Sequence, residues 1–328
     1  MKIFVCEFIT GGGLYREPLS AALAGEGTLM RDALLRDLAQ LPDIVISTSY
    51  DSRLPAPQHI NQVVTISEQD DAWTIWNECI SDADAVWAIA PETDGILAKL
   101  TALVQYHNKI LLGCGMQAVE IATSKMKTFQ ILQAASINTV PCYTAGSWPS
   151  EEPGPWVAKL DDGVGCGGTV CFDNSAQLAA WLLDISDTKY IIQPYLLGIP
   201  ASLSILCKQG HAWLLSCNQQ KVTLENSKFS YHGSILNGMA EYWPAFEQLA
   251  NQIAAAIPTL AGYIGVDVIV HKTQIEVLEI NPRLTTSYVG LQQAIGCNPA
   301  GLVLDLFYND DFNLPEISRN MVDVSLNA

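Results

Sequence analysis

The sequence predicts an α/β protein: an N-terminal doubly wound parallel-sheet domain over residues 1–115, followed by a two-part α+β domain over residues 116–328. Three observations lead to this prediction. The chain has 328 residues, enough for about two domains. Its first third alternates short apolar runs with segments of helical periodicity, as in parallel sheets covered by helices. Beyond residue 116, longer strands and a hairpin replace this alternation.

Short apolar runs mark the expected strands of the N-terminal sheet, at Ile3–Phe8, Ile44–Thr48, Val63–Ile66, Val86–Ala90 and Ile110–Cys114. Segments with helical periodicity lie between them, at Leu29–Leu41, Ala72–Ile80 and Gly95–Tyr106. Ligands of such sheets bind beyond the carboxyl ends of the strands. Two loops are expected at that edge, Thr10–Gly13 after the first strand and Pro91–Gly95 after the fourth.

The second domain is expected to begin with a helix over Ser124–Ala135. A part of about 124–198 then holds short strands around one helix, at Trp156–Leu160, Val170–Phe172, Ser175–Leu183 and Tyr190–Tyr195. A part of about 199–328 holds longer strands, a helix and a hairpin, at Ala201–Cys207, His211–Cys217, Trp243–Ile257, Ile264–Val270 and Gln274–Ile280. Two further helices are expected to close the chain.

Composition and charge narrow the function classes. The formal net charge is −17, from 17 basic and 34 acidic residues, which repels nucleic acid and anionic membrane surfaces. Nine Cys occur without a CxxC pair, which favours buried thiols in a reducing compartment over a structural zinc site. Glu7 and the Gly11–Gly13 run interrupt any signal-peptide core, and no apolar stretch reaches the ~18 residues of a membrane span. We therefore expect a cytoplasmic protein with no nucleic-acid or membrane partner.

The C-terminal hairpin carries the most informative polar residues. Glu279 and Asn281 are two apart in a strand pattern, so their side chains point to one face. Mg²⁺ prefers such oxygen ligands, and Asp267 on the preceding strand is the natural third. Asp267 shares that face only if the connection near 271–273 has an odd number of residues or a β-bulge shifts the register. The alternative is an acidic edge strand with solvated carboxylates, but Arg283 beside it adds a cation suited to phosphate or carboxylate.

With these residues in place, the chain resembles the ATP-grasp superfamily of carboxylate–amine and carboxylate–thiol ligases. The resemblance covers most of residues 116–328, and residues 1–115 resemble the pre-ATP-grasp domain that usually precedes it. It depends on four features in order, each weak alone: residues 124–128, residues 156–159 with the glycine loop after them, residues 193–195, and Asp267 with residues 279–283.

The resemblance implies that ATP and Mg²⁺, or Mn²⁺ in its place, bind between a lid part, 124–198, and a metal-binding part, 199–328. It implies nucleotide contacts from Lys125, Lys159, Gly165, Gly167, Gly168, Gln193, Tyr195 and Leu196. The implied metal ligands are Asp267, Glu279 and Asn281. In the same way, Arg283 is expected to steady a carboxylate or acyl phosphate, and Lys221 to reach the γ-phosphate.

The implied reaction joins a carboxylate to an amine through an acyl phosphate, with release of ADP and phosphate. Short motifs at Glu7–Gly13, Pro91–Gly95 and Tyr231–Gly233 are similar to the tyramine–glutamate ligase group of methanofuran biosynthesis. Glutamate is therefore the expected carboxylate substrate, and tyramine or tyrosine the expected amine. A homodimer is a further expectation. The expected substrate residues are Gly12, Glu92, Asp94 and Tyr231, with Glu92 and Asp94 holding the amine.

Departures from the family pattern leave alternatives open. Ser124 stands where an Asp often precedes the first lysine, and 199–201 lack the Glu that often holds the ribose. A non-catalytic ATP-binding regulatory protein, or a ligase for unrelated amino-acid or peptide substrates, is therefore an alternative. Residues 163–168 also match the dinucleotide fingerprint GxGxxG, which would indicate a dehydrogenase. Residues 169–172 after it predict a strand where that fingerprint requires a helix, which favours a hairpin loop.

Overall fold

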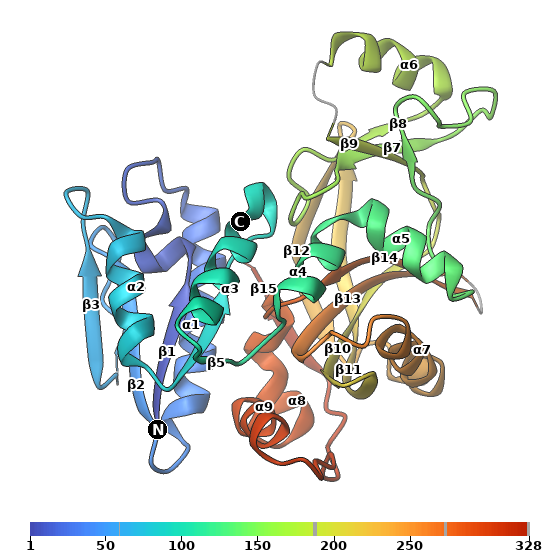
Figure 1. Cartoon of the computed structure of the whole chain (residues 1–328). Coiled ribbons are helices and arrows are strands. Elements are labelled where there is room, and N and C mark those ends of the chain that lie inside the picture. The colour runs from blue at the N-terminus through green and yellow to red at the C-terminus, as the bar shows by residue number, and fades with distance from the viewer. Residues whose placement is uncertain (59, 186–188, 272–273, 327–328) are drawn as a thin grey trace.

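The computed structural model describes residues 1–58, 60–185, 189–271 and 274–326. Figure 1 shows an N-terminal lobe on the left and a C-terminal lobe on the right, with a smaller subdomain that carries α6 above the C-terminal lobe. The structure confirms the predicted order of the two units, a parallel-sheet unit followed by a mixed α+β unit.

The N-terminal sheet has five parallel strands in the order β3-β2-β1-β4-β5. They are β1 (Lys2–Glu7), β2 (Val45–Asp51), β3 (Gln62–Ile66), β4 (Ala85–Ile89) and β5 (Ile110–Leu111). The helices of this lobe are α1 (Ala21–Ala39), α2 (Ala72–Asp82) and α3 (Ile96–Tyr106). The strand order reverses between β1 and β4, so the segments after them lie where such sheets bind ligands, namely η1 (Ile9–Gly13) and η2 (Thr93–Gly95).

Helix α1 begins earlier than the sequence predicts, at Ala21 and not at Leu29. The Ser20 hydroxyl caps the helix by accepting a hydrogen bond from the Leu23 amide, 3.2 Å away. Gly27 lets the helix approach the end of β1, because a Cβ at this position would lie 2.8 Å from Glu7 Oε2. The added turns extend the helix toward the edge of the sheet where η1 lies.

The C-terminal lobe is built on the antiparallel strands β14-β13-β10-β11-β12 of a ten-stranded sheet. Their bounds are β10 (Ile199–Lys208), β11 (His211–Glu225), β12 (Lys228–Leu236), β13 (Gly262–His271) and β14 (Gln274–Asn281). The sequence does not predict β12, because half of this strand is polar and partly exposed. The two further helices that the sequence predicts after the hairpin are present, and they are followed by a strand that it does not predict: β15 (Val322–Ser325) pairs with β12 and covers its edge.

A small part of the same sheet forms the lid subdomain, which consists of β6 (Tyr143–Thr144), β7 (Trp156–Leu160), β8 (Val170–Phe172), α6 (Ser175–Asp184) and β9 (Tyr190–Pro194). It has its own apolar core of Trp156, Ala158, Phe172, Leu178 and Ile192. Its ladder connection to the large part of the sheet is one pair, Val170 of β8 with Lys228 of β12.

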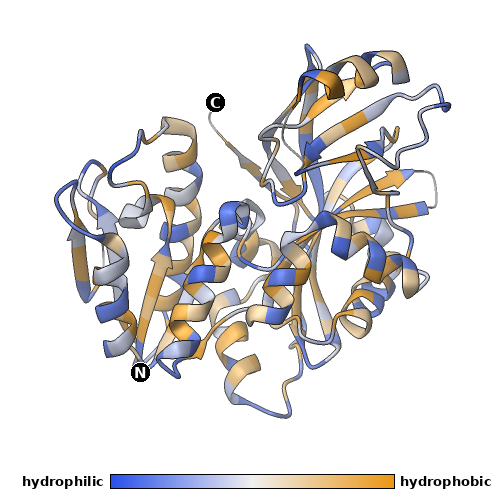
Figure 2. Ribbon diagram, turned by 45° about the horizontal axis from the view of Figure 1, so that its top comes forward, coloured by the Kyte–Doolittle hydropathy of each residue, from blue (hydrophilic) through white to orange (hydrophobic). Residues whose placement is uncertain are grey.

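The remaining helices pack around the large sheet: α4 (Met116–Thr123), α5 (Lys125–Ala134), α7 (Trp243–Ala256), α8 (Leu291–Ile295) and α9 (Pro299–Tyr308), with η3 (Ala240–Tyr242) and η4 (Thr286–Gly290). The expected boundary at residues 115/116 falls between β5 and α4, but two buried apolar clusters extend across it. One of them joins Leu34 and Trp87 of the N-terminal lobe to Tyr263, Tyr288 and Leu302. Figure 2 shows hydrophobic residues along β1 and mixed hydropathy on the helices. Within the described residues, no helix is long and apolar enough to cross a bilayer.

Candidate active site

The hairpin of β13 and β14 meets the geometric requirement that the sequence sets for its carboxylates. Asp267 pairs directly with Glu279, and Gly265 pairs with Asn281, so the three polar side chains share one face. His271 pairs with Gln274, and a register shift after Asp267 makes Leu278 the extra residue of a β-bulge. The bulge therefore supplies the change of register, while residues 272–273 lie outside the described part of the chain.

Asp267 is held by two amide groups. Gln220 Nε2 on β11 donates to Oδ1 at 2.8 Å, and Asn281 Nδ2 donates to Oδ2 at 3.2 Å. Burial, with the nearby Glu279 carboxylate, raises the pKa of Asp267 to about 7. A pKa this far above that of a free aspartate shows that the Asp267 carboxylate, which lies next to Glu279, lacks a countercharge. A bound cation would supply that countercharge.

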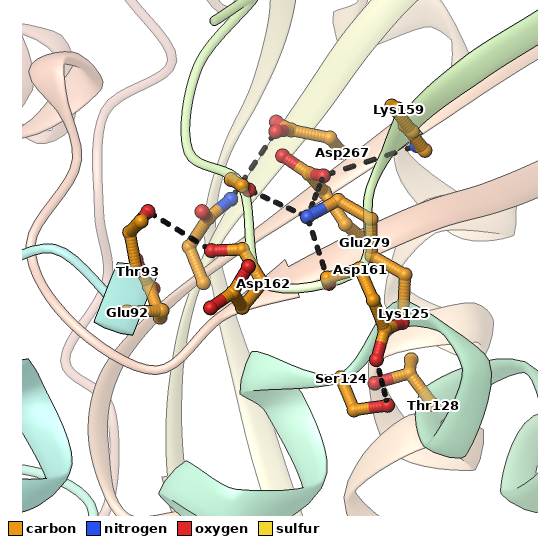
Figure 3. A network of polar contacts seen from close by, with 12 residues as sticks. Glu92, Thr93, Ser124, Lys125, Thr128, Lys159, Asp161, Asp162, Asp267 and Glu279 are labelled. Atoms are coloured by element: carbon orange, nitrogen blue, oxygen red, sulfur yellow. Dashed lines mark hydrogen bonds and ion pairs between the residues drawn. The ribbon is translucent and has the colours of Figure 1, made fainter. Parts of the chain in front are cut away.

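Glu279 lies between two lysines from different elements, as Figure 3 shows. Lys125 Nζ on α5 is 3.3 Å from Glu279 Oε2, and Lys159 Nζ on β7 is 4.0 Å from the same oxygen. Burial alone would favour the neutral acid, but the two ammonium groups lower the pKa of Glu279. Burial lowers the pKa of Lys159, and Glu279 opposes this shift. Two carboxylates and the Asn281 amide on one face are a donor set that fits Mg²⁺.

A single cavity of about 460 Å³ extends from this hairpin to the lid subdomain and the N-terminal lobe. The predicted site residues that line it are Lys159, Gly165, Gln193, Tyr195, Leu196, Tyr231, Asp267, Glu279, Asn281 and Arg283. The sequence does not single out Gln220, Glu26 or Met30, which also line it. Glu26 and Met30 are one turn apart on α1, and Glu26 precedes the predicted start of that helix at Leu29.

Lys125 contacts the beginning of the glycine loop. Its Nζ lies 2.5 Å from the carbonyl oxygen of Gly163 and 3.3 Å from that of Asp161. The Asp161 carboxylate accepts hydrogen bonds from Ser124 Oγ at 2.7 Å and the Met126 amide at 2.8 Å, and so caps α5 (Figure 3). The sequence departs from the family at Ser124, and the structure brings a carboxylate there from the end of β7. No sequence signal pairs two positions this far apart.

Arg283 is oriented by Glu92. Its Nε and Nη2 atoms donate to Glu92 Oε2 at 3.0 and 2.9 Å. Burial would lower the pKa of Arg283, but Glu92 outweighs it and the pKa is raised. Glu92 is buried behind Arg283 and is not among the described residues that line the cavity, so it does not reach an amine there as the sequence predicts. Glu92 therefore belongs to the site, but it binds Arg283 and not the substrate amine.

Several predicted site residues lie elsewhere. Lys221 points away from the cavity and pairs with Asp323 at 2.6 Å, because successive side chains of β11 point to opposite faces and Gln220 and Val222 take the face that lines the cavity. Asp94 is exposed and pairs with Lys189 at 3.2 Å. Gly12 packs against Ile66 inside the N-terminal lobe. The contact is so close that a Cβ on Gly12 would lie 2.7 Å from the Ile66 side chain. Gly167 and Gly168 belong to the loop, although neither is among the described residues that line the cavity.

The glycine loop connects two antiparallel strands. β7 pairs with β8 from Trp156 opposite Phe172 to Ala158 opposite Val170, so the GxGxxG segment forms a hairpin loop and opens no helix. The dehydrogenase interpretation is therefore wrong, because it required a helix directly after the GxGxxG segment. Cys166 in this loop is no activated nucleophile, because burial raises the pKa of its thiol to about 11.

Comparisons with known proteins agree with this geometry. Residues 122–287 match the model of the ATP-grasp domain, and residues 44–119 match the model of the pre-ATP-grasp 3 domain. The chain is 28% identical over 274 residues to tyramine–L-glutamate ligase from Methanocaldococcus jannaschii, an alignment that covers 81% of this chain and 78% of the relative.

Solved structures share the fold over almost the whole chain. A protein of the ATP-grasp superfamily from Archaeoglobus fulgidus has a TM-score of 0.72 at 19% identity and covers 99% of both chains. Biotin carboxylase from Campylobacter jejuni, in complex with β-γ-ATP, has a TM-score of 0.74 at 15% identity and covers 97% of this chain and 73% of its own.

Proposed function

Because the chain belongs to the ATP-grasp family, we propose that it is an ATP-dependent ligase that joins a carboxylate to an amine and releases ADP and phosphate. The observation that carries this proposal is the placement of Arg283 in one cavity with Asp267, Glu279 and Asn281. A cation-binding face and a guanidinium in the same cavity suit a phosphoryl group that is transferred to a carboxylate.

The nucleotide is assigned to the lid side of the cavity. Lys159, Gly165 and the strand end at Gln193–Leu196 line that side, so the backbone of Tyr195 and Leu196 would meet the base. The glycines of the loop allow backbone N–H groups to approach phosphate oxygens closely. Mg²⁺, held by Asp267, Glu279 and Asn281, would neutralise charge on the transferring phosphoryl group.

The chemistry of the chain's own residues follows from these positions. Arg283, oriented by Glu92, binds the substrate carboxylate so that one of its oxygens attacks the γ-phosphorus, and the bond from that phosphorus to ADP breaks. The amine nitrogen then attacks the carbonyl carbon of the acyl phosphate and loses a proton, and the carbon–oxygen bond to phosphate breaks. Positioning and fixed charge supply the rate enhancement, and no protein nucleophile is needed.

L-Glutamate and tyramine are the proposed substrate pair. The support is the 28% identity to tyramine–L-glutamate ligase, together with a cavity that combines Arg283 with the aromatic Tyr231. The Tyr231 hydroxyl is 2.9 Å from Thr286 Oγ1, which fixes the ring beside the cavity.

An assay of product identity tests the proposal. The protein is incubated with ATP, Mg²⁺ and L-glutamate, with tyramine, tyrosine or no amine, and nucleotide products are separated by chromatography. We expect ADP and phosphate in a 1:1 ratio with the amide product, and no amide when either substrate is omitted. Release of AMP and pyrophosphate would indicate an adenylating enzyme and contradict the acyl-phosphate route.

A further inference from the structure

The N-terminal lobe places one carboxylate, Glu26, on the wall of the cavity. It projects from the early turns of α1, whose start is fixed by the Ser20 cap and whose approach to β1 is permitted by Gly27. Met30 lines the same wall one turn later, because residues i and i+4 share a helix face. The side chain is therefore carried by a regular helix and lines the cavity from the N-terminal lobe.

Glu26 differs from the other acids of the cavity in its partners. Asp267 accepts hydrogen bonds from Gln220 and Asn281. Glu279 forms ion pairs with Lys125 and Lys159. Within the part of the chain that the structure describes, Glu26 has no hydrogen-bond or ion-pair partner. It is partly buried, which raises its pKa, and Arg283 is near enough to oppose that shift. A half-buried carboxylate without a partner favours a cationic ligand.

We propose that Glu26 binds the ammonium group of the amine substrate, with Met30 and Tyr231 contacting its apolar or aromatic body. The inference rests on the proposed ligase function and adds the residue that selects the second substrate. The chemical class is a primary amine that is protonated in solution and carries an apolar or aromatic body.

Two features favour an organic ammonium over a second metal ion. Glu26 has no second carboxylate or amide beside it on α1, because the positions one turn away are Ala22, Leu23, Leu29 and Met30, whereas Asp267 is paired with Glu279 and Asn281. One ammonium needs only one carboxylate and hydrogen bonds to neutral oxygens, and Thr286 and Ser287 line the same cavity.

The location of Glu26 also favours the amine over the carboxylate substrate. The carboxylate is assigned to Arg283, and Glu26, Arg283 and Tyr231 line the same cavity. An amine held by Glu26 would therefore lie in the same cavity as the carbonyl carbon that it must attack, and the Glu26 carboxylate would take the proton that the ammonium loses before its nitrogen attacks.

The test compares Glu26→Gln with Glu78→Gln, the same change at an exposed position on α2 of the same lobe. KM for tyramine is measured by ADP release, and KM for L-glutamate by trapping the acyl phosphate with hydroxylamine in the absence of tyramine. For Glu26→Gln we expect KM for tyramine to rise about tenfold, the worth of one charge-assisted hydrogen bond, and KM for glutamate to change much less. Glu26→Asp, which keeps the charge, should recover part of the loss, and Glu78→Gln should behave as wild type.

The outcomes separate the two proposals. An unchanged KM for tyramine in Glu26→Gln, or a rise confined to KM for glutamate, would overturn the role of Glu26 and leave the ligase proposal intact. If the wild-type protein forms no hydroxamate and no amide with any pair in the substrate screen, the ligase function itself is wrong, and the inference is overturned with it.

Discussion

The N-terminal lobe and the lid subdomain are attached to the central sheet in different ways. The N-terminal lobe shares buried apolar clusters with that sheet, which place Leu34 and Trp87 in one core with Tyr263 and Tyr288. The lid subdomain has a small core of its own and one ladder pair to β12. Its other described links to the body are mostly polar and include hydrogen bonds of Asp161 and Gly163 with α5 and the ion pair of Lys159 with Glu279.

This difference divides the cavity wall into a fixed part and a part able to move. Glu26, Arg283, Asp267 and Glu279 belong to elements joined by buried apolar contacts, so their mutual geometry is set by the fold. Lys159 and the glycine loop belong to the lid subdomain, whose apolar core is separate from the two clusters that join the rest of the molecule. The substrates would therefore meet on the fixed part, and closure would come from the lid subdomain.

The largest effect is expected on the fixed part, at Glu279. Glu279→Gln removes one carboxylate of the proposed metal site and the countercharge of Lys125 and Lys159. Mg²⁺-dependent ATP turnover should fall about 10²- to 10³-fold, the loss expected when a fixed charge at the reacting centre is removed. Steady-state assays of ADP release across Mg²⁺ concentrations measure it.

The matched control is Glu276→Gln, which makes the same change on β14 outside the described cavity lining. It should retain wild-type turnover. If Glu279→Gln also retains turnover, Glu279 is not a metal ligand and the assignment of that face is wrong.

An intermediate effect is expected at the junction of the two lobes, at Asp37 of α1. Asp37 is fully buried and lies 3.6 Å from Arg36 Nε, and burial raises its pKa to about 6. The folded protein thus keeps this proton to a higher pH than the unfolded chain does. Its contribution to stability is complete below about pH 4 and is lost as the pH rises through about 6.

In Asp37→Asn this titration is absent. The free energy of unfolding of Asp37→Asn minus that of wild type should increase by roughly 2 to 3 kcal/mol between pH 4 and pH 7. Urea unfolding at a series of pH values measures it, with exposed Asp311→Asn as the control. A difference that does not vary with pH would show that Asp37 is charged in both states and that the junction is more hydrated than its burial indicates.

The smallest effect is expected at the attachment of the lid subdomain. Asp161→Ala removes the two hydrogen bonds that cap α5 next to Lys125. We expect KM for ATP to rise about tenfold with kcat nearly unchanged, because one charge-assisted anchor is lost and the fixed part is intact. Faster proteolytic cleavage in the glycine loop should accompany it.

Asp173→Ala, at an exposed position of the lid subdomain, is the control and should leave KM unchanged. A fall in kcat with unchanged KM in Asp161→Ala would mean that Asp161 acts in the chemical step and not in attachment.

Local pattern in the sequence predicts the part of the fold that depends on short-range physics. The five strands of the N-terminal sheet and the β13–β14 hairpin follow from apolar runs and periodicity. The bulge at Leu278 does not, because no glycine or other local signal marks it. Glu26 is missed because Gly25 and Gly27 weaken the helical pattern around it, although Ser20 is a usable capping signal.

Long-range pairing accounts for the remaining differences in the site. Glu92 with Arg283, and Asp161 with Ser124, are contacts between positions far apart in the chain, and spacing carries no information about them. Lys221 is an error of another kind: the family resemblance selects it, but the structure places the adjacent residue at the site. Its neighbour Gln220 faces the metal end because adjacent side chains of a strand point to opposite faces, and the face of Gln220 is the one that lines the cavity.

The core shared by the two lobes also limits how such a protein can be re-engineered or diversify. Transplanting the N-terminal lobe from a relative would cut through a contiguous set of packed side chains that includes Leu34, Tyr263 and Leu302, and the chimera would have to repack its interior. Glu26 of α1 is only partly buried and lies outside that cluster, so it can change without repacking the interior. If Glu26 selects the amine, new amine preferences are reached by point substitution and not by exchanging modules.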